Sequence, residues 1–137
     1  MNITVSQVEG RVPVTIVRLQ GELDGSNYLD VIDKARELYE AGSQFMLLDM
    51  SEVPFMGSSG LVALHSIALL LRGEEVPDPE HGWGAFHSLD RDREAGVQKH
   101  MKLLSPQPEV KRVLEVSGLT DVYFEIYTDQ ELAVASF

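Results

Sequence analysis

The sequence contains no cysteine among its 137 residues. This absence excludes disulfide bonds, thiolate nucleophiles and thiolate metal ligands, so the fold depends on its apolar core. Hydrophobic residues make up 44% of the chain, which is ordinary for a globular protein and too high for a disordered one. The length predicts a single domain over residues 1–137.

Positive charge is scarce. The chain has 11 Lys and Arg against 22 Asp and Glu, which gives a net charge of -11. A protein that binds nucleic acid neutralises phosphates with a basic face, so this composition argues against nucleic-acid binding. It is compatible with a basic protein partner, and also with an acidic surface that only aids solubility.

Long apolar segments are missing as well. A membrane-spanning helix needs about 20 apolar residues, and the apolar run at residues 59–71 is shorter than that. Residues 1–5 lack the basic segment followed by an apolar one that marks a signal peptide. We therefore expect a cytoplasmic protein that does not bind membranes.

Apolar periodicity predicts strands and helices in alternation. The predicted strands are 2–8, 12–19, 44–50, 100–104 and 122–127, and the predicted helices are 26–41, 59–71, 108–117 and a short one after a capping box at 128–131. The first two strands are close enough in sequence to form an antiparallel hairpin. The order predicts an α/β fold with a mixed sheet of about five strands, an antiparallel hairpin at one edge, a largely parallel remainder and about four helices.

The most informative stretch is 54–61, which joins the strand at 44–50 to the helix at 59–71. A loop with Pro and Gly, followed by a serine pair and an apolar periodic run, is typical of a strand-to-helix junction. Ser58 or Ser59 is expected to be the N-cap. Free N–H groups and the helix dipole at such a position also favour a phosphate. From these residues alone, both serines could be nothing more than caps.

The segment Asp49-Met-Ser-Glu-Val-Pro-Phe-Met-Gly-Ser-Ser-Gly-Leu61 resembles the signature of the STAS domain, the fold of anti-sigma factor antagonists. Two weaker matches, at residues 21–24 and 113–119, occur in the order of that family. The resemblance implies binding to an anti-sigma factor that is also a serine-protein kinase. That kinase would phosphorylate the first serine of the pair, here Ser58, with Ser59 as the alternative. ATP and magnesium would belong to the kinase, so no cofactor is expected for this chain.

The resemblance also implies a partner-binding surface around residues 54–61, which we call the serine loop. Its predicted residues are Asp24, Phe55, Met56, Gly57, Ser58, Ser59, Gly60 and Leu61. The family usually has Asp or Thr where this chain has Gly57, so a side chain is missing beside the acceptor. For Phe55 and Met56, folding under the loop as core is the alternative to partner contact. The alternative function is a STAS module that is not phosphorylated and that senses a ligand or acts as a scaffold, binding a small anion or another protein.

Residues 72–99 interrupt the periodic pattern with seven acidic and four basic residues and several glycines and prolines. A connection of 28 residues is longer than usual for such a unit, and longer than the family generally has there. We interpret it as an extended loop insertion, with Trp83 and Phe86 as local anchors and a helical turn at 89–95. The helix at 59–71 is apolar all round, so either this insertion or a partner is expected to cover its outer face.

Catalytic and metal sites are weakly supported by the sequence. The spacings among His81, His87, Asp90 and His100 match no helical metal-ligand pattern, so no metal is predicted. A nucleophile elbow requires Gly two residues before its serine, and Met56 occupies that position before Ser58. We therefore expect a binding protein and not an enzyme.

Overall fold

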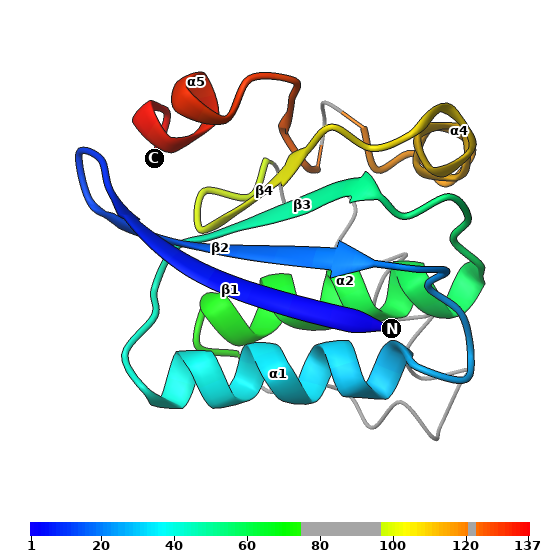
Figure 1. The fold of residues 1–137 in the computed structure, drawn as a ribbon, viewed down its shortest axis with the longest axis horizontal. Helices are drawn as coiled ribbons and strands as arrows, with labels where there is room; N and C mark the ends of the chain where they lie inside the picture. The colour runs from blue at the N-terminus through cyan, green and yellow to red at the C-terminus, as the bar shows by residue number, and fades with distance from the viewer. Residues whose placement is uncertain (75–96, 121–122) are drawn as a thin grey trace.

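The computed structural model describes residues 1–74, 97–120 and 123–137. Its strands form one sheet in the order β1-β2-β3-β4-β5, so strands that follow one another in the chain are also neighbours in space (Figure 1). The strands are β1 (Asn2–Glu9), β2 (Pro13–Gln20), β3 (Met46–Glu52), β4 (Met101–Leu104) and β5 (Ile126–Tyr127). The helices among these residues are α1 (Tyr28–Glu40), α2 (Ser58–Leu71), α4 (Pro108–Val116) and α5 (Gln130–Ala135).

The pairing directions confirm the predicted fold class. β1 runs antiparallel to β2, while the other neighbouring pairs, β2–β3, β3–β4 and β4–β5, are parallel. Pro13 is the first residue of β2, a position that suits a residue without a backbone N–H. The parallel pairs need crossover connections, and α1 and α4 supply two of them between β2 and β3 and between β4 and β5.

The period of two along each strand divides the apolar side chains between the two faces of the sheet. One face packs against α1, α2 and α4 through Val17, Leu19, Met46, Leu48, Met101 and Leu103. The other face packs against α5 through Val14, Ile16, Leu47 and Leu104. Figure 1 shows α1 and α2 below the sheet and α5 above it. Among the described residues, none of the helices is long and apolar enough to span a bilayer.

Helix α2 is buried all round, as its composition predicted. Every residue from 60 to 71 is buried within the chain. The isolated protein therefore leaves no exposed apolar face on the body of this helix. Only its first turn reaches the surface.

Two boundaries near the C-terminus were predicted wrongly. The strand expected at 122–127 is reduced to Ile126–Tyr127, although Tyr123 and Phe124 are fully buried. Phe124 forms an isolated bridge with Thr120 and is not part of a strand. The prediction was too long because an apolar run indicates burial and does not by itself indicate strand pairing. The cap of α5 is Asp129, whose carboxylate accepts a hydrogen bond from the Leu132 N–H at 3.0 Å, and not the predicted box starting at residue 128.

Several predictions concern residues outside the described ranges. These are the anchors Trp83 and Phe86, the helical turn at 89–95, and the residues His81, His87 and Asp90 weighed as metal ligands.

Candidate functional site: the serine loop and the start of helix α2

Two loops are joined where β2 and β3 end. Leu23, after β2, and Met56, after β3, form an isolated parallel bridge. The Leu23 N–H donates to the Phe55 carbonyl at 3.0 Å, and the Gly57 N–H donates to the Leu23 carbonyl at 2.9 Å. The loop that carries Asp24 is therefore fixed against the serine loop.

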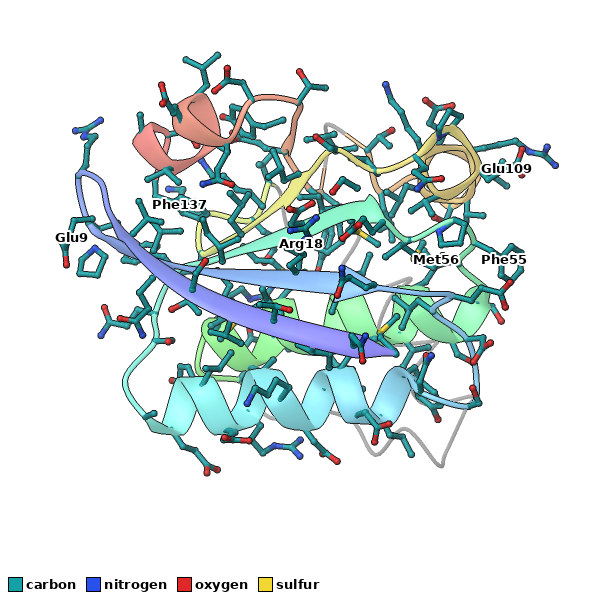
Figure 2. The ribbon with its side chains drawn as sticks, viewed as in Figure 1. Glu9, Arg18, Phe55, Met56, Glu109 and Phe137 are labelled. Carbon is teal, nitrogen blue, oxygen red and sulfur yellow. The ribbon has the colours of Figure 1, made fainter. Side chains whose placement is uncertain are left out.

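The extended conformation of the serine loop sends neighbouring side chains in opposite directions. Met56 is 1% exposed and packs in the core with Leu23, whereas Phe55 is 50% exposed (Figure 2). The sequence left open whether these two side chains fold under the loop as core or lie on the surface. Met56 lies in the core and Phe55 lies on the surface. Gly60 and Leu61 are buried too. Met56, Gly60 and Leu61 therefore lie beneath the surface of the isolated protein, and their contact with a partner stays a prediction.

Helix α2 begins at Ser58, and its N-cap is Gly57 with φ -84° and ψ -179°. The prediction that Ser58 or Ser59 is the N-cap is therefore wrong, since both serines lie in the first turn. Glycine is an accepted N-cap residue, but it has no side chain to bond the free N–H groups. The Gly60 N–H instead donates to the Gly57 carbonyl at 3.0 Å.

The two serines differ in exposure. Ser58 is exposed, and its hydroxyl makes no hydrogen bond to any residue that the structure describes. Ser59 is half-buried and faces the loop after β2, where a Cβ added to Gly25 would lie 3.6 Å from the Ser59 Oγ. An accessible hydroxyl in the first turn of a helix is placed where the helix dipole favours added negative charge. Ser58 meets that description and Ser59 meets it only in part.

Asp24 is held by its own loop. Its Oδ1 accepts hydrogen bonds from the Ser26 hydroxyl at 2.5 Å and from the Ser26 N–H at 2.9 Å. These bonds, the hydroxyl first, lower the pKa of the Asp24 carboxyl from its ordinary value of 3.8. The Asp24 N–H donates to the Asn27 Oδ1 at 3.0 Å, and the Asn27 amide donates to the Glu22 carbonyl at 2.7 Å. Asp24 is therefore an ionised group in a fixed position.

Gly25 and Asn27 belong to this site although sequence reasoning did not include them among the partner-binding residues. Asn27 is the N-cap position of α1, yet its side chain makes no cap bond and ties the loop after β2 together instead. The resemblance covered residues 21–24, so the loop that follows had no motif to mark it. Only the proximity of Gly25 to Ser59 places it here.

The two glycines of the serine loop have different reasons to be glycine. A Cβ on Gly60 would lie 2.2 Å from the Met56 Cγ and 2.9 Å from the Met56 Sδ, which is too close for any side chain without movement. A Cβ on Gly57 would meet only the Phe55 ring, at 3.9 Å. Packing therefore requires Gly60, whereas Gly57 leaves open space between the Phe55 ring and the first turn of α2.

A family model described as the STAS domain matches residues 5–76, which is more than half of the chain. The chain belongs to the STAS domain family. The match confirms the resemblance drawn from the serine loop. A comparison of this STAS domain with curated protein sequences finds no match.

Several solved structures similar to this STAS domain are described as anti-sigma factor antagonists. One is a putative anti-sigma factor antagonist from Thermotoga maritima, with a TM-score of 0.66 and 20% identity over 96% of this chain and 90% of that one. Another, from Mycobacterium paratuberculosis, has a TM-score of 0.61 and 18% identity over 97% and 94%. The Bacillus cell fate determinant SpoIIAA in its phosphorylated form has a TM-score of 0.54 and 19% identity over 97% and 96%. At these identities the similarity shows a shared fold.

Proposed function

We propose that this STAS domain is an anti-sigma factor antagonist that binds an anti-sigma factor with serine kinase activity, and that phosphorylation of Ser58 controls this binding. The observation that carries the proposal is the exposed Ser58 hydroxyl at the first residue of α2. It lies on a surface fixed by the Leu23–Met56 bridge and marked by the exposed Phe55. The antagonist names of the structural neighbours support the same function.

The binding surface combines one apolar side chain with acidic groups. Phe55 supplies a rigid aromatic ring, the type of residue that often contributes most of the energy of a protein interface. Asp24 supplies a fixed negative charge, and the whole chain has a net charge of -11. A partner with an apolar pocket and basic residues around it is complementary to this surface.

Phosphorylation acts on this surface by adding charge. A phosphoserine carries about -1.5 to -2 at neutral pH. In the free domain the first turn of α2 stabilises that charge through its dipole. Inside an interface the phosphate is desolvated and lies on a surface that already carries Asp24, so the complex is weakened. The switch needs little change in fold, and the ATP and magnesium for the transfer belong to the partner.

The experiment measures the affinity of four proteins for the anti-sigma kinases of the source organism by calorimetry. Unphosphorylated wild type, Ser58→Ala and the matched control Ser59→Ala are expected to bind alike. Ser58→Asp is expected to bind at least ten-fold more weakly, since its charge mimics part of the phosphate. Equal affinity of Ser58→Ala and Ser58→Asp would contradict the proposed switch.

The open space beside Gly57 favours one second candidate, an unphosphorylated module that binds a small anion at the start of α2. Titration with inorganic phosphate, followed by the NMR amide signals of residues 57–60, separates the two. Saturable shifts together with no kinase binding support the module. Kinase binding that survives replacement of 73–98 by a short linker supports the switch.

A further inference from the structure

The outer edge of β1 is unpaired among the described residues. β1 is the first strand in the sheet order and pairs only with β2. Figure 1 shows β1 beside β2 at the front of the molecule. An edge strand presents a row of free N–H and C=O groups, which is a template for pairing with another strand.

β1 lacks the features by which proteins usually protect such an edge. Its eight residues, Asn2–Glu9, include no proline and no lysine or arginine, and the single charge is at the last position, Glu9. The opposite edge strand, β5, has only two residues. Three apolar side chains of β1 are half-buried and not fully covered: Ile3, Val5 and Val8. The edge is long, regular and partly apolar.

We propose that β1 of a second copy of this chain pairs with this edge, antiparallel about a two-fold axis, to form one continuous sheet through both copies. Such an axis is perpendicular to the sheet and keeps each face on its own side. Residues opposite one another must then share a face, so their positions must both be odd or both be even. The registers centred on Val5 and on Ser6 both satisfy this condition, with equal overlap over residues 2–8 and 3–9. We take the register centred on Val5, because the other places the charged Glu9 opposite the apolar Ile3.

The central side chains of β1 are self-complementary in that register, while Ile3 lies opposite Gln7 and Asn2 lies opposite Val8. Val5 lies opposite Val5 of the partner copy, and Thr4 lies opposite Ser6 of the partner copy. Apolar pairs and hydroxyl pairs directly opposite each other stabilise antiparallel strands. No two like charges are opposed within residues 2–8, which contain no charged residue. This self-complementarity favours a second copy over a strand from another protein.

The net charge predicts how the self-association depends on salt concentration. Two copies that each carry -11 repel one another, and salt screens this repulsion. The self-association is therefore expected to strengthen as the salt concentration rises. Pairing with a basic strand of another protein would weaken under the same conditions.

The absence of cysteine allows a direct test of the register. Val5→Cys places two thiols opposite each other on the axis, with Cα atoms about 4.5–5.5 Å apart, a separation that suits a disulfide. Gln7→Cys is the matched control, because it lies on the same strand and face but its two copies are offset by four residues, or about 13 Å along the strand. Under mild oxidation the Val5→Cys dimer is expected to form at least ten-fold faster than the Gln7→Cys dimer.

Sedimentation velocity on the wild type provides the second measurement. We expect the sedimenting mass to rise from that of a monomer to that of a dimer as the protein concentration increases. Added salt should shift this transition to lower protein concentration. A monomer at every concentration and salt, or a dimer whose two cysteine variants crosslink at equal rates, would overturn it. If Val5→Cys does not fold by circular dichroism, slower amide exchange in wild-type β1 at high protein concentration decides the same question, and unchanged exchange overturns the proposal.

Discussion

Met56 lies over Gly60 so closely that a Cβ on Gly60 would be 2.2 Å from the Met56 Cγ and 3.2 Å from the Leu23 Cδ2. The first turn of α2, the serine loop and the loop after β2 are thus packed together through one glycine. Met56 contacts Gly60 through its side chain and Leu23 through the backbone bridge, and the Leu23 N–H bonds the carbonyl of the neighbouring Phe55. The stability of the domain and the shape of its surface are linked at this contact.

Gly60→Ala is therefore expected to destabilise the domain. Overpacking costs about 1–3 kcal/mol, and the better helix propensity of Ala returns up to about 1 kcal/mol. We expect a net loss of about 1–2 kcal/mol in the free energy of unfolding, measured by urea denaturation. Gly57→Ser, in the same loop but with open space, is the control and should lose nothing. A Gly60→Ala protein as stable as wild type would contradict the packing account.

The N-cap position of α2 is expected to accept a capping side chain. Gly57 has the extended backbone of an N-cap and room for a Cβ. Asp at this position can bond the free N–H groups of the first turn, so Gly57→Asp should be more stable than Gly57→Ala by about 0.5–2 kcal/mol. The comparison of two non-glycine variants removes the effect of glycine on the unfolded chain. Equal thermal stability of the pair would show that the position is not an effective cap.

Substitutions of Phe55 and Met56 are expected to have different effects, on partner binding for Phe55 and on stability for Met56. Met56→Ala removes a buried side chain and should cost about 2–5 kcal/mol of stability. Phe55→Ala removes an exposed ring and should leave the unfolding free energy within about 1 kcal/mol of wild type. If Phe55 anchors the partner, its truncation should weaken kinase binding by about 2 kcal/mol, or roughly 30-fold, in calorimetry. A stable Phe55→Ala protein with wild-type affinity would remove Phe55 from the proposed interface.

A buried lysine joins α5 to the sheet. Lys102 is 5% exposed, and its Nζ donates to the Ser136 carbonyl at 3.0 Å and to the Ser136 hydroxyl at 2.9 Å. It also forms an ion pair with Glu125 at 2.9 Å. Hydrogen bonding from Lys102 is the main reason why the pKa of the Glu125 carboxyl is lowered from its ordinary value of 4.5.

This pair predicts a specific dependence of stability on pH. A carboxyl with a lowered pKa in the folded state contributes stability above its unfolded pKa, and that contribution is lost as the pH falls through the folded pKa. The stability difference between wild type and Lys102→Met should therefore narrow as the pH falls below about 4.5. Urea denaturation from pH 7 to pH 3 measures it, with the exposed Lys111→Met as control. A difference that stays constant would contradict the role of this pair.

The order of strands and helices could be predicted from the spacing of the apolar residues. Buried side chains recur every two residues along a strand and every three to four residues along a helix. Val17 and Leu19 face the helices, while Val14 and Ile16 face α5, and this alternation is visible in the residue pattern itself. The prediction of a strand at 122–127 was too long because it also rested on the pattern of buried residues alone. Tyr123 and Phe124 are buried but lie outside the regular strand β5, and a pattern of burial does not distinguish a strand from another buried segment.

The position of the serine pair in the fold was predicted in outline, and the directions of the side chains around it were not. The motif placed the serine pair at the start of α2, but it could not show that Gly57 and not a serine ends the extended segment. Nor could it show that Met56 turns inward and Phe55 outward, since both are apolar neighbours in one loop. Those directions depend on the bridge between Leu23 and Met56, a contact between residues distant in sequence.

The proposed switch depends on phosphorylation of Ser58. Mass spectrometry of the protein purified from its native cells tests it most directly. The tryptic peptide 37–72 contains both Ser58 and Ser59, so fragmentation must separate them. We expect one phosphate on this peptide, located on Ser58, with Ser59 unmodified. A phosphate on Ser59 alone, or none under any growth condition despite full coverage of the peptide, would contradict it.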